Sequence, residues 1–148
     1  MTKKLFDETD VYILTLGLSE VWHDEQTGGV FWRTIPKDAF DPARHKFRVS
    51  TVDENRDNLA AIHALIRKHR PDAKIVLTLS PIPLAATFRN VSCVSANTVS
   101  KAVLRVAIDE IMRDVGPEGA LHYWPGFEIV VYAFGAPFKA DRRHLPEA

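Results

Sequence analysis

The stretch VYILTL at residues 11–16, followed by Gly17, decides the fold. Such a nearly continuous run of β-branched and apolar residues predicts a strand that is covered on both faces, as in parallel sheets. Two more runs have the same character, KIVLTL at residues 74–79 and FEIVVY at residues 127–132. Each run ends at residues suited to a turn, so three short parallel strands are expected.

A helix is predicted between the first two strands. Thr51 and Glu54 have the spacing of a capping box, in which the hydroxyl and the carboxylate satisfy free backbone donors at the helix start. Apolar residues then recur at helical spacing before Pro71 ends the helix. They are Leu59, Ile62, Leu65 and Ile66.

A second helix is expected from about Asn97 to Val115, where Gly116 and Pro117 stop it. Its apolar surface is broad, which indicates burial against the sheet and a further element. Strands and helices therefore alternate along a chain of 148 residues, a length that suits one domain. The expected fold class is α/β, a three-layer sandwich with a parallel sheet.

The composition excludes several classes of function. Nineteen Lys and Arg balance nineteen Asp and Glu, so no electrostatic footprint for a nucleic acid or an anionic membrane is present. No segment has the pattern of a signal peptide or a membrane span, and Cys93 is the only cysteine. A cytoplasmic protein is expected. Phosphate-binding glycine loops and metal-ligand patterns are missing from the sequence, so neither a cofactor nor a metal is predicted.

Two long connections, residues 17–50 and 80–96, leave the carboxyl ends of predicted strands, where open α/β sheets bind ligands. In the first, residues 21–24 and 30–33 are expected to form a hairpin. The tryptophans fit either an acceptor groove or simple packing. They are Trp22, Trp32 and Trp124.

Two motifs carry potential chemistry. Asp141 precedes His144 by three residues, a spacing at which a carboxylate can orient an imidazole for proton transfer. A solvated polar segment is the alternative. Gly17 and Ser19 follow a buried strand, where backbone N–H groups and a short polar side chain can face an oxyanion. The alternative there is a strand-ending turn.

Other polar residues have structural interpretations beside functional ones. Ser80 follows a predicted strand, where Pro81 indicates a rigid turn rather than a nucleophile. Ser100 and Lys101 are adjacent on a helix and do not face each other, so they form no Ser-Lys pair. Asn97 and Lys101 are expected to cap and decorate the second helix, and Asn97 is also kept as a candidate ligand-binding residue.

Five segments, in this order, resemble the GSCFA family of the SGNH hydrolase superfamily: Thr15–Trp22, Leu77–Pro83, Ala96–Lys101, Tyr123–Glu128 and Asp141–His144. The resemblance covers most of residues 11–144. It implies a flavodoxin-like fold and ester chemistry by a Ser-His-Asp triad. His144 is then the general base and Asp141 its orienting partner.

The resemblance also places candidates for oxyanion or substrate binding. Gly17 fits a backbone donor, and Ser19 stands at the position of an asparagine. The other candidates are Glu20, Trp22, Ser80 and Asn97. The family's Gly-Ser-Cys-Phe-Ala segment, which carries the nucleophile, does not occur in the sequence. Residues 1–148 are therefore expected to be a single partial domain, truncated at its N-terminus.

Two functions follow as hypotheses. The first is an esterase, acyl hydrolase or acyltransferase domain that acts on ester-linked acyl groups, with saccharide esters among the candidate substrates. Its nucleophile would come from elsewhere. The alternative is an inactive α/β remnant that acts as a binding or interaction module. A small sheet with two open edges also predicts self-association.

Overall fold

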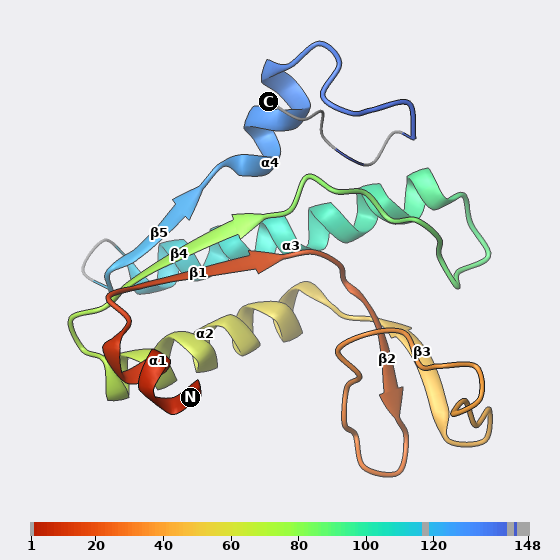
Figure 1. The fold of residues 1–148 in the computed structure, drawn as a ribbon, viewed down its shortest axis with the longest axis horizontal. Coiled ribbons are helices and arrows are strands. Elements are labelled where there is room, and N and C mark those ends of the chain that lie inside the picture. Colours follow the sequence, from red (N-terminus) through yellow and green to blue (C-terminus); the bar gives the residue numbers. More distant parts are fainter. Residues whose placement is uncertain (1, 117–118, 142–143, 145–148) are drawn as a thin grey trace.

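The centre of the molecule is a parallel sheet of three strands (Figure 1). The computed structural model describes residues 2–116, 119–141 and 144. The strand β4 (Lys74–Leu79) lies between β1 (Val11–Leu16) and β5 (Leu121–Trp124), and both pairings are parallel.

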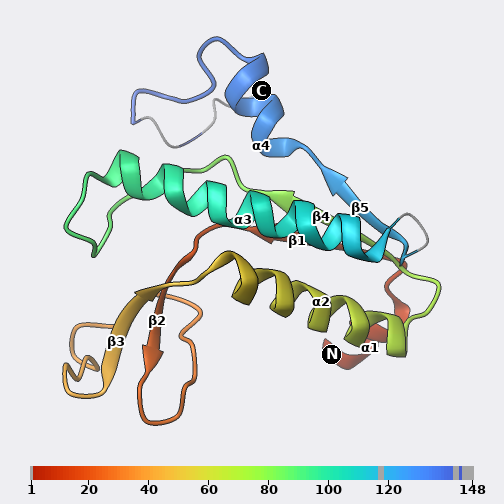
Figure 2. The ribbon, with the colours of Figure 1, turned by 180° about the vertical axis from the view of Figure 1, so that it is seen from behind.

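Two long helices connect these strands. The first, α2 (Val52–His69), links β1 to β4, and the second, α3 (Cys93–Val115), links β4 to β5. Both helices lie side by side over one face of the sheet (Figure 2). A short helix, α1 (Thr2–Glu8), precedes β1. The expected fold class is confirmed as α/β, with a parallel sheet flanked by helices as in a flavodoxin-like sandwich.

The core lies between the sheet and the two long helices. In β4, Ile75, Leu77 and Leu79 alternate along the strand and are buried in this layer. From α3, Leu104 and Ile108 pack into the same cluster. Burying each such side chain stabilises the fold by roughly 1.5–3 kcal/mol. The two helices are therefore held on the sheet mainly by apolar contact.

The opposite face of the sheet is more open than the sequence predicts. Side chains of β1 alternate in exposure, and Ile13 is 67% exposed. Trp124 on β5 is exposed as well. The continuous apolar runs predict strands covered on both faces. Within the described residues, α2 and α3 cover one of them.

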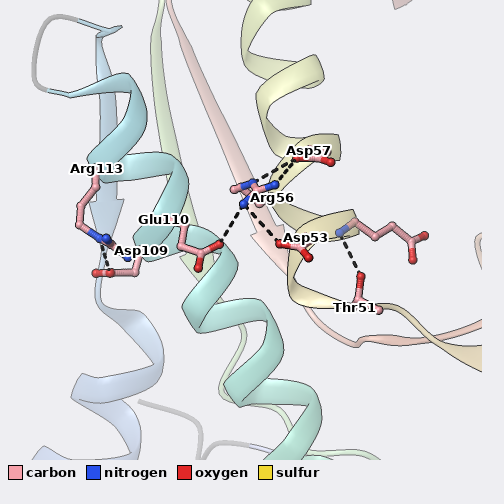
Figure 3. A network of polar contacts seen from close by, with 8 residues as sticks. Thr51, Asp53, Arg56, Asp57, Asp109, Glu110 and Arg113 are labelled. Carbon is pink, nitrogen blue, oxygen red and sulfur yellow. Dashed lines mark hydrogen bonds and ion pairs between the residues drawn. The ribbon is translucent and has the colours of Figure 1, made fainter.

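A polar network joins α2 to α3 beside the core (Figure 3). Arg56 of α2 lies 3.7 Å from a carboxylate oxygen of Glu110 on α3. It also pairs with Asp53 at 3.3 Å and with Asp57 at 2.9 Å on its own helix. Exposed ion pairs of this kind contribute about 0–1 kcal/mol each, so the network adds little to the stability that apolar packing provides.

An antiparallel pair of strands, β2 (Glu20–Asp24) and β3 (His45–Val49), extends beyond the carboxyl end of β1 (Figure 1). The predicted hairpin of residues 21–24 and 30–33 is formed in part: Val30 bridges His23, and the Phe31 backbone N–H donates to the Trp22 carbonyl at 2.9 Å, but residues 31–33 do not extend into a strand. On the other edge of β2, β3 pairs along the whole strand, and Phe47 lies opposite Trp22 in register, with ring centroids 5.6 Å apart. Such cross-strand aromatic pairs stabilise a ladder.

The start of α2 agrees with the sequence in part. Thr51 is the N-cap, and its hydroxyl accepts a hydrogen bond from the Glu54 backbone N–H at 3.1 Å. The Glu54 carboxylate binds the Arg48 guanidinium at 2.6 and 2.7 Å instead of closing the capping box. The hydrogen bond from Arg48 lowers the pKa of Glu54, although burial opposes the shift. A charge-assisted bond to Arg48 is stronger than one to a neutral N–H.

The third predicted strand was wrong. Residues 127–132 lie in helical turns, with α4 at Gly126–Glu128 and a π-helical turn at Ile129–Ala133. The strand is β5 instead, and it ends directly before Pro125. Proline lacks the N–H that a sheet ladder requires, so pairing stops there. A short apolar run cannot by itself distinguish a strand from a buried helical segment.

The second predicted helix begins earlier than expected. Its first residue is Cys93, after the N-cap Ser92, so Asn97 lies in the second turn and does not cap the helix. The helix ends at Val115 before Gly116, as predicted. Among the described residues, no helix is long and apolar enough to cross a membrane.

Replacing a core residue of α3 should test this packing. Ile108 is fully buried, so Ile108→Ala should lower the free energy of unfolding by about 2–5 kcal/mol through lost contact and a residual cavity. Val106→Ala, at a position 45% exposed on the same helix, should change it by no more than about 0.5 kcal/mol. Urea unfolding measures both, and equal losses would contradict the assigned core face.

Candidate functional site

The turn after β1 is held by two consecutive residues of α3. The Lys101 ammonium donates a hydrogen bond to the backbone carbonyl of Gly17 at 2.8 Å. The Ser100 hydroxyl oxygen accepts one from the backbone N–H of Ser19 at 2.7 Å. Both α3 residues are buried, so the turn and the helix form one polar layer under the carboxyl end of the sheet.

Ser19 lies at the centre of this layer. It is 0% exposed, and its carbonyl accepts hydrogen bonds from the backbone N–H of Ser50 at 2.7 Å and from the Ser50 hydroxyl at 3.0 Å. Its own hydroxyl has no partner among the described residues. The Ser19 N–H already donates to the Ser100 hydroxyl, so this hydrogen bond must break before the N–H can donate to an oxyanion.

The sequence predicted that Lys101 decorates the surface of the helix. In the structure it is a buried cation instead. Its exposed fraction is 4%, and among the described residues no carboxylate forms an ion pair with it. Burial lowers its pKa to about 8. The sequence did contain a signal for this burial. Lys101 lies three residues before Leu104 and seven before Ile108, so it shares the buried face of α3.

The segment after β4 is tied to both neighbouring elements. The Ser80 backbone N–H donates to the carbonyl of Leu16 at 2.8 Å, and the Ser80 hydroxyl accepts from the Ile82 N–H at 3.3 Å. The Asn97 side-chain oxygen accepts from the Leu84 N–H at 3.0 Å. Ser80 therefore has the local role of a turn residue, and Asn97 positions the segment on α3.

The predicted acid–imidazole pair is formed. An Asp141 carboxylate oxygen lies 2.6 Å from Nδ1 of His144, and the other accepts a hydrogen bond from the His144 backbone N–H at 3.1 Å. The Lys139 N–H donates to the His144 carbonyl at 2.8 Å. With Nδ1–H held by the carboxylate, Nε2 carries the lone pair that a general base needs.

Three adjoining cavities surround the segment after β4. The aromatic cavity, about 430 Å³, is lined by residues that include Glu20, Trp22 and Leu84. The central cavity, about 360 Å³, is lined by Leu84, Asn97 and Asp141 among others. Leu84 therefore borders two cavities, and the central cavity places a member of the acid–imidazole pair beside Asn97.

The third cavity adjoins the central one through Asn97. This lysine cavity, about 490 Å³, is also lined by Lys101 and Arg105, and α4 with the π-helical turn forms its far wall. Gly17, Ser19 and Ser80 are not among the lining residues of the three cavities. The predicted site residues thus divide into a buried support and a set that borders open space.

The aromatic cavity has an organised wall. The Trp22 ring makes edge-on contacts with Phe88 at 4.9 Å and Phe40 at 5.4 Å between centroids. The buried Nε1 of Trp22 has no hydrogen-bond partner among the described residues. The Glu20 carboxylate accepts from the Thr87 hydroxyl at 2.8 and 3.0 Å. Sequence reasoning found Trp22 but missed Phe88, because only folding brings the two connections together.

A second polar cluster lies between α3 and α4. The Arg105 guanidinium is 2.9 Å from the Glu128 carboxylate and stacks 4.6 Å from the centre of the Tyr123 ring. The Tyr123 hydroxyl donates to Glu128 at 2.7 and 2.9 Å, and burial raises the pKa of that phenol. Within the described residues, no group of His, Cys, Asp and Glu side chains is placed to hold a metal ion.

These features define an α/β protein with an acid–imidazole pair near the carboxyl end of its parallel sheet. A model of the GSCFA family matches residues 1–148, and the chain belongs to this family, which is part of the SGNH hydrolase superfamily. Comparisons with the curated proteins and with the solved structures gave no match.

Removing the Ser100 hydroxyl should test the support under the turn. In Ser100→Ala the buried Ser19 N–H loses its acceptor, which should cost about 1–3 kcal/mol of unfolding free energy. Ser95→Ala is the matched control, because Ser95 is exposed on the same helix. Chemical denaturation compares the two, and an equal response would show that the bond to Ser19 contributes nothing.

The stability of the β2–β3 strand pair, which carries part of the aromatic cavity, should be sensitive to acid. The hydrogen bond from Arg44, first among several causes, lowers the pKa of Asp24 from 3.8 to about 2. Because the folded pKa is depressed, the stability from this pair is complete above about pH 4 and is lost as the pH falls towards 2. Tryptophan fluorescence during acid titration should show a transition in this range that Asp24→Asn removes. Asp38→Asn, at an exposed position of the same connection, should keep it.

Proposed function

We propose that the chain carries the acid–base part of an SGNH-type serine esterase, acyl hydrolase or acyltransferase site that acts on ester-linked acyl groups. The observation that carries this proposal is the 2.6 Å contact between Asp141 and Nδ1 of His144. Membership of the GSCFA family supports it, because the superfamily uses this pair in ester chemistry.

The proposed chemistry uses each part of the pair. His144 Nε2 takes the proton of a serine hydroxyl as the oxygen attacks the ester carbonyl, and Asp141 stabilises the imidazolium that forms. His144 then gives the proton to the departing alkoxide, which leaves as an alcohol. Water repeats the sequence and releases the acid, or an acceptor hydroxyl takes the acyl group in a transferase.

In this proposal the serine nucleophile is supplied from outside this sequence. Among the described residues, no serine hydroxyl lies within hydrogen-bonding distance of His144. Residues 1–148 then act as a partial domain that is completed by a further segment or by a partner chain. The cytoplasmic location expected from the sequence stays a prediction.

The aromatic cavity supports a saccharide ester as the substrate. Aromatic faces such as that of Trp22 suit the apolar side of a sugar ring. The carboxylate of Glu20 lines the same cavity and can accept from such hydroxyls. The cavity adjoins the central one at Leu84, so a sugar bound there would place its ester near Asp141.

The alternative is a binding module without turnover. The observation that favours it is the missing serine partner of His144 among the described residues. In this interpretation the exposed β1 edge pairs with a second copy or another chain. A defined dimer that binds saccharides and resists labelling by a serine-directed fluorophosphonate is its expected behaviour.

The mass of the native product and two variants distinguish these functions. In the protein isolated from its source cells, His144→Ala should lower the rate of p-nitrophenyl acetate hydrolysis by at least about a thousandfold. Asp141→Asn should also lower it strongly, because the imidazole loses its orienting carboxylate. His122→Ala, an exposed histidine on β5, is the control. Unchanged hydrolysis in His144→Ala would contradict the proposal, and a native mass near 16.7 kDa without activity would favour the binding module.

A further inference from the structure

The lysine cavity combines a polar side made of donors with an apolar wall. Asn97, Lys101 and Arg105 lie along α3 on the polar side. The opposite wall is apolar and comes from the C-terminal part of the chain: Phe127, Val131, Tyr132 and Phe138. A ligand that fills this cavity must therefore have one polar end and one apolar end.

The two cations of this cavity differ in how their charges are balanced. Arg105 pairs with Glu128 at 2.9 Å and lies 3.7 Å from Asp109. The described residues offer Lys101 no carboxylate, and its one hydrogen-bond acceptor is the Gly17 carbonyl. An ammonium has three N–H donors, so Lys101 keeps unused donors. A buried unbalanced cation favours an anion at this end of the cavity.

Asn97 adds a neutral donor beside Lys101. Its side-chain oxygen is already used by the Leu84 N–H at 3.0 Å, so the amide NH₂ remains as the group that can meet a ligand. The polar side of the cavity thus presents N–H donors from Asn97 and Lys101, one turn apart on α3. Side chains four residues apart share one face of a helix, so both donors can reach the same carboxylate.

We propose that the lysine cavity binds the carboxylate of a linear aliphatic acid, with its head group at Asn97 and Lys101 and its chain against Phe127 and Tyr132. The burial that lowers the pKa of Lys101 to about 8 agrees with a cation that lacks its anion. The lysine cavity adjoins the central cavity, which Asp141 lines, through Asn97, so we identify this acid with the acyl group of the ester. Only that identification rests on the proposed function.

The test compares sodium octanoate with 1-octanol, two probes with the same chain length and different head groups. In isothermal titration calorimetry at pH 7 the protein should bind octanoate at least tenfold more tightly than octanol. Lys101→Met should remove this preference, whereas Lys68→Met, at an exposed position of α2, should retain it. Equal affinity for both probes, or a preference that survives Lys101→Met, would overturn the proposal.

A second variant tests the cavity without changing the hydrogen bond from Lys101 to the Gly17 carbonyl. Ala102 lines the cavity and is exposed, so Ala102→Trp should fill it while the unfolding temperature stays unchanged. This variant should lose binding of both probes, and retained binding would show that the acid binds elsewhere. Octanoate binding without ester hydrolysis would count against the proposed function alone. Ester hydrolysis without a preference for octanoate would count against this inference alone.

Discussion

The packing of α3 on β4 is the constraint on which the other parts depend. One face of α3 is apolar towards its C-terminal half, where Leu104 and Ile108 meet the sheet, and polar one turn earlier, at Ser100 and Lys101. Apolar burial fixes the axial position of the helix, and that position brings the polar residues against the Gly17 turn. The same helix also holds the segment after β4 through Asn97. Support for the fold and for the candidate site therefore comes from one helix face.

Much of this arrangement could be predicted from local patterns, because local forces determine it. The runs that form β1 and β4, the Thr51 cap and the glycine after Val115 all have short-range signatures. The pairing of Asp141 with His144 also needs only a three-residue spacing. The remainder depends on contacts between distant residues. Residues 127–132 have a strand-like composition, but they follow Pro125 and form helical turns. Lys101 has a side chain typical of protein surfaces, but its position on α3 is buried.

The site separates positioning from contact with a ligand. Ser50 and Ser100 satisfy the backbone carbonyl and N–H of Ser19, which gives the turn after β1 a fixed shape. The groups that border open space, Trp22 and Asp141, lie in the long connections and in the segment after α4. Rigid elements thus support variable loops, as α/β folds commonly arrange their binding residues.

The parallel pairing of β1 with β4 has a consequence for synthesis of the chain. Val11 lies opposite Lys74, so the two partners are separated by about 60 residues of sequence that include the whole of α2. During translation β1 leaves the ribosome long before its partner exists, and loop closure must precede the first contact of the sheet. Until then the apolar residues that later pack against the core, Leu14 and Leu16 among them, stay exposed to water and to other nascent chains. The early growth of this protein is therefore the stage at which chaperone binding would matter most.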